Sequence, residues 1–292
     1  MSIWRRVGHH TRAVLKRPIG TVSWTAMRLL ARDVSDEIAT CRLLVLAPHP
    51  DDETIACGGC IARVVRSGED VFVAVVTDGR FARHDIEASE TALIREGELS
   101  RAVAALGLSS SQYASLGYED DSLTAHIDDL AARIGDLIRA YRPTVLLSSW
   151  AHDTHRDHAA LGRATRMATA QADVLLLEYV VWAWSTPLRL ARGRLPRTTA
   201  IDAEARHGSA RFTMGRAVRV RTDEYLSTKT EAVSAHRSQL APSADRLGLP
   251  SGHGPLGYRF LRRFLGSSEY FLAHSPRGSA RMGGNLPADH VP

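Results

Sequence analysis

The sequence is poor in cysteine and contains no long apolar segment. Three of its 292 residues are cysteines, at positions 41, 57 and 60, and so few exclude the disulfide framework of a small secreted protein. No apolar run approaches the 18 or more residues that a membrane span requires. The basic N-terminus also lacks the apolar core of a secretory signal. We therefore expect a cytoplasmic protein.

Several functional signatures are also missing. No internal repeat of the 20–50 residues typical of solenoids is visible. No G-x-G-x-x-G motif follows the first apolar run, which argues against a dinucleotide-binding enzyme. The net charge is +5, but no RNA-binding aromatic motif or zinc-finger spacing accompanies it, so we expect no nucleic-acid partner. The 44% hydrophobic and 24% charged shares are those of a globular protein.

The N-terminal segment differs from the rest of the chain. Residues 1–32 contain seven arginines and lysines and no acidic residue, with Trp4, Trp24 and several aliphatic side chains between them. Such a segment can pack on its own domain or on a second copy in a homo-oligomer, or make peripheral contact with an anionic membrane. We divide the chain into a basic N-terminal arm (1–40), a catalytic domain (41–274) and a disordered tail (275–292).

The central part of the chain alternates between two patterns. Apolar runs occur at 42–47, 71–76, 113–116, 144–149 and 174–180. Between them, apolar residues recur at helical spacing near 61–65, 92–106, 130–141 and 159–170. Continuous apolar runs are typical of strands buried on both faces of a parallel sheet. The alternation predicts an α/β fold with a Rossmann-like, doubly wound, mostly parallel sheet and helices on both faces. We expect further strands near Ala200 and Val218, and a helix from Thr222 to about Gln239.

The first group of chemically active residues follows the first apolar run directly. It reads His49-Pro50-Asp51-Asp52-Glu53, at the carboxyl end of a strand, where open α/β sheets bind their ligands. His49 and Asp52 are three residues apart and suit one divalent ion, because zinc accepts imidazole nitrogen and carboxylate oxygen. Asp51 is then free to act as a base on water. The alternative is a polar turn that caps a helix beginning near Glu53.

A second group follows the fourth apolar run. It contains three histidines and two aspartates in the seven residues 152–158. In the common doubly wound strand order the first and fourth strands are neighbours, so the two polar loops should face each other across one crevice. Two ligands from the first loop and one histidine from the second make three protein ligands, as in a catalytic zinc site.

Together the two motifs resemble the PIG-L/LmbE-like zinc-dependent N-acetylglucosaminyl deacetylases. The resemblance spans residues 42–240 and includes Gly58-Gly59, Thr77-Asp78-Gly79, Arg95-x-x-Glu98, Leu116-Gly117-Tyr118 and His236-Arg-Ser-Gln239. Pro48, Glu119 and Asp121 depart from the family pattern, and they leave the substrate open.

The resemblance implies a role for each matching residue. The metal ligands are His49, Asp52 and His158, with Zn²⁺ expected and Fe²⁺ or another divalent ion as alternatives. The catalytic residues are Asp51 as general base, His155 as the group that stabilises the tetrahedral intermediate or protonates the leaving amine, and Asp157 as the carboxylate that orients His155. The substrate-binding residues are Arg95, Asp120 and His236.

The implied activity is hydrolysis of an acetamido group on an amino sugar. The N-acetylglucosamine-type substrate would be a small glycan or glycoconjugate, on a lipid, inositol, nucleotide or natural-product scaffold. A zinc amidase acting on a thiol conjugate is the alternative. A nucleotide-binding or membrane-binding module is a weaker alternative, because that function would leave both His/Asp loops unexplained. Cys57-Gly-Gly-Cys60 has redox-motif spacing, but we interpret it as packing of small residues.

Overall fold

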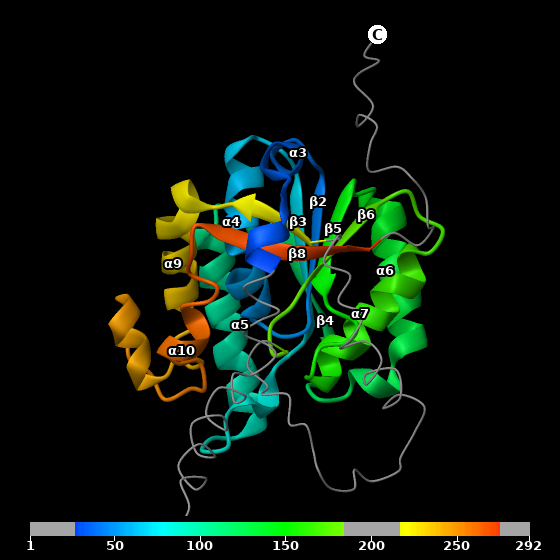
Figure 1. Ribbon diagram of the computed structural model, residues 1–292. Coiled ribbons are helices and arrows are strands. Elements are labelled where there is room, and N and C mark those ends of the chain that lie inside the picture. Colours follow the sequence, from blue (N-terminus) through cyan, green and yellow to red (C-terminus); the bar gives the residue numbers. More distant parts are fainter. Residues whose placement is uncertain (1–26, 184–216, 275–292) are drawn as a thin grey trace, which may run out of the picture.

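The computed structural model describes residues 27–183 and 217–274, which contain an eight-stranded sheet in the order β1-β7-β8-β6-β5-β2-β3-β4 (Figure 1). The strands are β1 (Arg32–Asp33), β2 (Leu43–Ala47), β3 (Val71–Thr77), β4 (Tyr113–Tyr118), β5 (Val145–Ser149), β6 (Leu175–Tyr179), β7 (Ala217–Arg221) and β8 (Ser268–His274). β8 runs antiparallel to β6 and β7, and the other neighbouring strands are parallel.

Helices cover both faces of this sheet. The α-helices are α3 (Ser35–Ala39), α4 (Asp52–Arg66), α5 (Ala88–Ala105), α6 (Ile127–Tyr141), α7 (Arg156–Thr169), α9 (Leu226–Ala235) and α10 (Tyr258–Leu261). Figure 1 shows α4, α5 and α9 on one side and α6 and α7 on the other. None of the helices in the described ranges is long and apolar enough to cross a membrane.

The core consists of two apolar clusters separated by the sheet, and β2 contributes to both. Leu43, Val45 and Ala47 belong to the cluster under α4 and α5. Leu44 and Leu46 belong to the cluster under α6 and α7. Successive side chains of a strand point to opposite faces, so a strand covered on both faces must be apolar at every position. This explains why the run is continuous rather than alternating.

The predicted fold class is confirmed. The five predicted strands are β2 to β6, and their spatial order β4-β3-β2-β5-β6 is that of a Rossmann-type sheet. β2 pairs with β5, so the expected adjacency of the first and fourth strands is correct. The strand predicted near Val218 is β7, whereas the one near Ala200 lies outside the described residues. The helix predicted over 222–239 is shorter: a 3-10 turn at 223–225 precedes α9, which ends at Ala235.

The sequence analysis missed two edge elements. β8 alternates between buried and half-buried residues, and its mixture of serine, glutamate and aromatics gives no continuous apolar signal. Residues 27–40, which we had assigned to the N-terminal arm, pack on the domain. There β1 pairs with β7, and Val34 and Ile38 are buried. Residues 1–26 and the tail at 275–292 lie outside the described residues, so the domain boundaries stay a prediction.

A buried ion pair ties β8 to the helix that begins at the first polar loop. Lys229 of α9 donates to Glu269 Oε1 of β8 over 2.7 Å, and both side chains are buried. The Glu269 carboxylate also accepts the backbone N–H groups of Gly59 and Cys60 in α4, over 2.7 and 2.8 Å. Cys57 and Cys60 are fully buried, and burial raises the pKa of both thiols well above its ordinary value. This environment fits packing residues rather than reactive thiolates.

We expect Gly59→Ala to lower the free energy of unfolding by about 1–3 kcal/mol, the usual cost of overpacking. A Cβ at position 59 would lie 2.5 Å from the Thr222 side chain. The control is Gly97→Ala in α5, where a Cβ would lie 3.5 Å from the guanidinium of Arg101. That change should be neutral or stabilise by about 0.4–1 kcal/mol. Equal thermal unfolding of the two variants would contradict close packing at Gly59.

Candidate metal and catalytic site

The first polar loop makes a strained turn at the carboxyl end of β2. Thr77 fixes its start, because its backbone N–H and its hydroxyl both donate to the Pro48 carbonyl. Asp51 then has φ 143° and ψ −28°, a conformation that costs a non-glycine residue about 1–3 kcal/mol. The Glu53 carboxylate stabilises the turn by accepting the Asp51 N–H over 3.0 Å, and the Asp51 carbonyl begins α4 by accepting from Ile55. Strain of this kind is typical of functional sites.

The two polar loops meet as predicted. Asp52 Oδ2 lies 3.2 Å from His49 Nδ1 and 3.2 Å from His158 Nε2. The His155 ring lies beside them, with its centroid 4.9 Å from that of His49 and 5.1 Å from that of His158. His49 comes from the loop after β2, and His155 and His158 come from the start of α7, after β5. The switch between β2 and β5 therefore brings all four side chains into one cluster.

His158 has the environment of a metal ligand. Its side chain is fully buried. In the described ranges its Nδ1 makes no hydrogen bond, and its Nε2 lies 3.2 Å from Asp52 Oδ2. Single ligand atoms of His49, His155 and His158 lie within 4.8 Å of one another, as do those of His49, Asp120 and Asp157. Imidazole nitrogen and carboxylate oxygen are the donors that zinc accepts in catalytic sites. The residues present therefore fit a divalent ion, and buried imidazoles of this kind are costly without a partner.

The role expected for Asp157 needs correction. Its carboxylate does not orient the His155 ring: it lies 3.3 Å from His49 Nε2 and accepts the backbone N–H groups of Asp121 and Leu123 over 2.7 and 3.1 Å. Only the backbone N–H of Asp157 reaches His155, donating to Nδ1 over 3.3 Å. His155 is thus the N-cap of α7, and the Asp157 carboxylate positions His49.

Asp120 reaches the same imidazole from the loop after β4. Its Oδ1 lies 3.2 Å from His49 Nε2, and its Oδ2 accepts the backbone N–H of Phe81 over 3.1 Å. Burial by itself raises the pKa of Asp120, but the hydrogen bond and charge of His49, the Phe81 N–H and the charge of Arg95 together lower it to about 2. A carboxylate on the second ring nitrogen fixes the orientation of a ligand histidine, so Asp120 has a role beyond the predicted contact with substrate.

Burial and close charges set the protonation states in the cluster. Burial raises the pKa of Asp51 to about 6. Burial would also raise the pKa of Asp52, but His158 and His49 hold it well below its usual range. Burial by itself lowers the pKa of His49, and the three carboxylates around it raise that pKa well above its ordinary value. Burial and two neighbouring imidazoles lower the pKa of His155 to about 4. At pH 7 Asp51 is therefore mainly ionised and His155 neutral.

Two of the predicted substrate-binding residues lie beneath the cluster instead of facing solvent. Arg95 is 3% exposed, donates to the carbonyls of Gly79 and Pro50, and lies 3.2 Å from Asp51 Oδ2. His236 is 1% exposed, with Nε2 3.3 Å from Glu53 Oε1. Because neither side chain is accessible, we correct their role from sugar contact to positioning of Asp51 and its turn.

Asp153 is a site residue to which the sequence analysis gave no role. It is buried, and its Oδ1 accepts the backbone N–H of His155 over 3.3 Å. Its Oδ2 accepts the N–H groups of Val181 and Trp182, over 2.9 and 3.1 Å. One carboxylate thus joins the His155 loop to the segment after β6. Its place within the 152–158 motif was the available signal in the sequence. Its partners Val181 and Trp182 lie almost 30 residues away along the chain.

We expect Asp153→Asn to lower kcat by about tenfold to a hundredfold, because small displacements of a reacting group have effects of that size. An amide offers one acceptor oxygen, so a backbone N–H would lose its partner, at a cost of about 1–3 kcal/mol. Steady-state kinetics and a melting curve measure the two effects. Asp173→Asn, which removes an exposed carboxylate, is the control. Unchanged kcat in the Asp153 variant would exclude a positioning role.

Residues 44–169, which contain both polar loops, match the family model described as PIG-L: GlcNAc-PI de-N-acetylase. These residues form a PIG-L family domain. The expected family is thus confirmed on the segment that carries the cluster of histidines and aspartates.

Two curated proteins similar to this chain are deacetylases. The chain is 28% identical to a 1D-myo-inositol 2-acetamido-2-deoxy-alpha-D-glucopyranoside deacetylase of Thermobifida fusca, over 80% of this chain and 93% of that protein. It is 32% identical to a probable N-acetyl-alpha-D-glucosaminyl L-malate deacetylase 2 of Bacillus cereus, over 44% of this chain and 61% of that protein. Both names describe deacetylation of an N-acetylglucosamine-type substrate.

A solved structure shares the fold. The N,N'-diacetylchitobiose deacetylase from Pyrococcus horikoshii superposes with a TM-score of 0.60 at 17% sequence identity, covering 87% of this chain and 92% of that one. At this identity the likeness shows the architecture alone.

Proposed function

We propose that this chain is a zinc-dependent deacetylase that hydrolyses the acetamido group of an N-acetylglucosamine-type sugar. The observation that carries the proposal is the convergence of His49, Asp52 and His158 beside an ionised Asp51, inside a PIG-L family domain. The deacetylase activity of the relatives supports the reaction type.

The metal would be held by His49, Asp52 and His158. When bound, a divalent ion of this kind polarises an amide carbonyl and makes water a stronger acid. Asp120 and Asp157 keep the His49 ring in place through its second nitrogen. Two imidazoles and one carboxylate suit Zn²⁺, and they also suit Fe²⁺. We propose Zn²⁺, and a metal analysis distinguishes the two.

Asp51 would accept the proton of the attacking water. Burial raises the pKa of Asp51 to about 6, so its carboxylate is mainly ionised at pH 7. A pKa this close to the working pH lets the carboxylate accept a proton and later release it. Arg95 lies beneath it and holds Oδ2 at 3.2 Å. This contact orients the carboxylate and opposes the effect of burial on its pKa. The strained backbone at Asp51 serves the same placement.

His155 would donate a hydrogen bond during the reaction. Its Nδ1 accepts the N–H of Asp157, so the neutral ring carries its proton on Nε2. That N–H can stabilise negative charge on the carbonyl oxygen through a hydrogen bond. The proton for the leaving amine would come from Asp51, which holds the proton taken from water. With a pKa of about 4, the His155 ring is neutral at pH 7. It is therefore not the protonated imidazole that would stabilise the oxyanion by its positive charge. We therefore assign His155 as a neutral donor.

Acetate release from a substrate panel tests this function. The full-length, zinc-loaded chain would be incubated with N-acetylglucosamine glycosides on inositol, lipid, nucleotide and carboxylated scaffolds, and with an S-conjugate amide for the thiol-conjugate alternative. We expect turnover of at least one acetamido sugar and none of the S-conjugate. Release from the S-conjugate alone would favour the alternative. Stoichiometric metal with no turnover of any amide would overturn the proposal.

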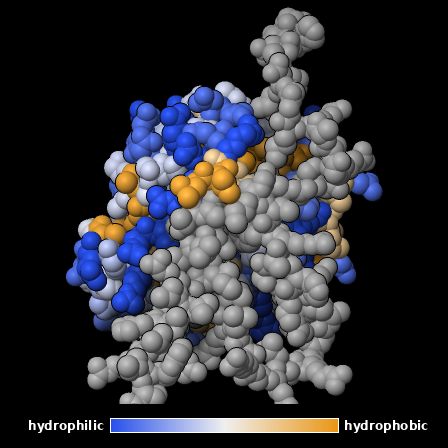
Figure 2. Space-filling view, viewed as in Figure 1, coloured by the Kyte–Doolittle hydropathy of each residue, from blue (hydrophilic) through white to orange (hydrophobic). Residues whose placement is uncertain are grey.

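The N-terminal arm leads to a separate prediction. Of residues 1–32, only 27–32 are described, and they include the exposed Leu29 and Leu30. Figure 2 shows several orange, apolar patches on a described surface that is otherwise mainly blue or white in this view. Each basic residue near an anionic bilayer contributes about 1 kcal/mol, so deletion of residues 1–26 should weaken sedimentation with anionic vesicles at low salt. Turnover of a soluble substrate should not change. Full-length chain that ignores such vesicles would exclude membrane contact.

A further inference from the structure

Glu98 is a buried carboxylate to which the mechanism above gives no role. It lies on α5, three residues after Arg95, and is 3% exposed. Its Oε1 accepts the backbone N–H of Ser238, and its Oε2 accepts the Ser238 hydroxyl, both over 2.7 Å. The Gln239 amide donates to the same hydroxyl over 2.8 Å. Both oxygens of the Glu98 carboxylate therefore hold the segment that follows α9.

His236 begins that segment and faces the first turn of α4. Its Nε2 lies 3.3 Å from Glu53 Oε1 and 3.2 Å from Thr54 Oγ1. The Thr54 hydroxyl donates to Glu53 Oε1 over 2.6 Å, so both atoms that face Nε2 are acceptors and the network assigns the ring proton to Nε2. Nδ1 makes no hydrogen bond within the described residues. The polar contacts that fix the ring there are therefore those to Glu53 and Thr54.

Glu53 connects His236 to the proposed general base. Its Oε2 accepts the Asp51 backbone N–H over 3.0 Å, while its Oε1 faces His236. The Asp51 backbone is strained, with φ 143°, and a strained residue persists only where the surrounding structure determines its conformation. The Glu53 carboxylate is held at one end by His236 and holds the Asp51 turn at the other. A displacement of His236 would therefore reach the Asp51 turn.

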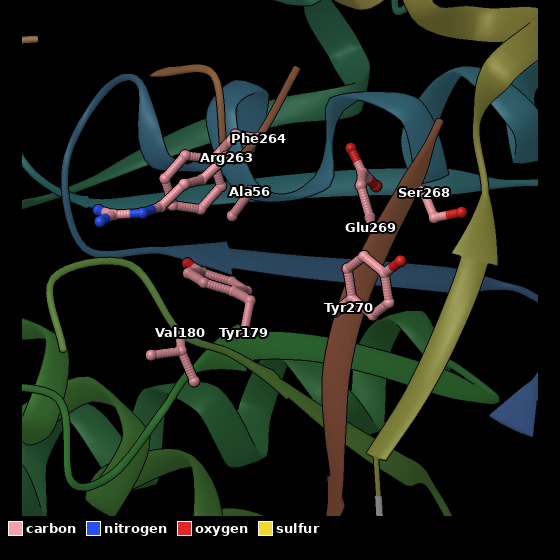
Figure 3. Close-up of a pocket in the computed structure, with 8 residues that line it drawn as sticks. All are labelled: Ala56, Tyr179, Val180, Arg263, Phe264, Ser268, Glu269 and Tyr270. Atoms are coloured by element: carbon pink, nitrogen blue, oxygen red, sulfur yellow. The ribbon is translucent and has the colours of Figure 1, made fainter. Parts of the chain in front are cut away.

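The rest of α4 is anchored separately. Figure 3 shows the Glu269 side chain of β8 beside this helix, and its carboxylate accepts the backbone N–H groups of Gly59 and Cys60. These contacts lie more than one helical turn beyond Glu53. They fix the helix, but they do not fix the Glu53 side chain. Its orientation depends on the groups that face Oε1, and His236 is one of them.

α5 thus reaches Asp51 in two ways. Arg95 contacts the side chain directly, 3.2 Å from Oδ2. Glu98 reaches the backbone of Asp51 indirectly, through the segment 236–239 and then Glu53. Two buried residues of one helix therefore hold the carboxylate and the strained backbone of the same aspartate.

We propose that Glu98 is a positioning residue for the general base Asp51. It acts through a relay that consists of Ser238, His236 and Glu53, and this relay keeps the Asp51 turn where its carboxylate can accept a proton from the attacking water. The inference rests on the proposed function, because it requires Asp51 to be the base. A displacement of about 1 Å at a reacting group can lower the rate about a hundredfold. The relay should therefore affect kcat and leave substrate binding nearly unchanged.

Glu98→Met tests the relay, because methionine has a similar volume and accepts no strong hydrogen bond. We expect kcat for an acetamido sugar to fall by about tenfold to a hundredfold, with little change in KM or in metal content. Glu98→Gln should keep most of the wild-type kcat, since its amide can accept the Ser238 N–H and donate to the Ser238 hydroxyl. The matched control is Glu96→Met, at an exposed position of α5, which should leave kcat unchanged.

Two double variants show whether the effect reaches the reaction through Asp51. In the Asp51→Asn background, Glu98→Met should lower kcat far less than in wild type, because no base remains to be positioned. Glu98→Met combined with His236→Phe should be no slower than the slower single variant, since contacts in one network are not additive. An undiminished loss in the Asp51→Asn background, or independent losses in the second pair, would overturn the relay.

The remaining outcomes separate the relay from the proposed function. Unchanged kcat in folded Glu98→Met, with only a lower melting temperature, would make Glu98 a purely structural residue and leave the proposed function intact. If Glu98→Met does not fold, Ser238→Ala, which keeps the backbone hydrogen bond, is judged by the same change in kcat. If wild type hydrolyses no acetamido sugar, the proposed function fails. Amide hydrogen exchange of residues 50–54 then decides the relay, and equal exchange in wild type and Ser238→Ala would overturn it.

Discussion

Asp51→Asn is expected to keep its metal and lose turnover by about 10²- to 10⁴-fold, the range observed when a general base is removed. The amide is nearly isosteric with the carboxylate, so the turn held by Glu53 and the contact with Arg95 should survive. An amide cannot accept the proton of water. Acetate release measured at saturating substrate gives kcat, and elemental analysis of the same protein gives the metal content.

Two comparisons make this result specific. Asp36→Asn removes an exposed carboxylate from α3 and should leave both kcat and metal content unchanged. Arg95→Met should reduce kcat less than Asp51→Asn does, because it disturbs the carboxylate without removing it. If Asp51→Asn keeps near-wild-type kcat at pH 7, Asp51 is not the base. If it loses the metal, Asp51 belongs to the ligand set.

His158→Ala is expected to lose most of its bound metal, and with it the activity. His158 is fully buried, and its Nε2 lies 3.2 Å from Oδ2 of Asp52, the other proposed ligand. The two donors therefore lie where one ion could bind both. Wild type should bind one divalent ion per chain. Elemental analysis after dialysis against metal-free buffer measures the difference, and circular dichroism confirms that the variant is folded.

His155→Ala is the informative partner of that experiment. The geometry allows His155 to join His49 and His158 around an ion, whereas the proposed ligand set contains Asp52 instead. We expect His155→Ala to retain metal and to lose rate. Retention of metal by His158→Ala, with loss from His155→Ala, would reverse the assignment of the two histidines. His126→Ala, at an exposed position before α6, should change neither quantity.

The sequence analysis placed both polar loops correctly because their positions follow from local pattern. Five apolar runs alternating with helical periodicity leave few topologies for a parallel sheet. In the common topology the loops after the first and fourth strands must meet. His49, Asp52, His155 and His158 were therefore predictable as one cluster, since each lies at a strand end or in the first turn of the following helix.

The partners of the surrounding side chains were not predictable in the same way. The family resemblance implied that the Asp157 carboxylate orients His155, but the turn at the start of α7 directs it to His49 and to the backbone at 121–123. Arg95 lies at a buried position of α5. Its guanidinium lies 3.2 Å from Asp51 Oδ2, beneath the turn that contains Asp51. A helical or strand period gives the face that a residue occupies, but not the group that it meets across the core.

The sequence by itself determined the fold class, the family and the chemistry of the two loops, because these depend on periodicity and on residue types at short spacing. Only the tertiary structure decided that Asp120 and Asp157 share His49 and that Asp153 couples His155 to Trp182. These contacts join residues separated by tens to more than a hundred positions. Their geometry depends on how β6, β8 and the helices pack, which no local pattern encodes.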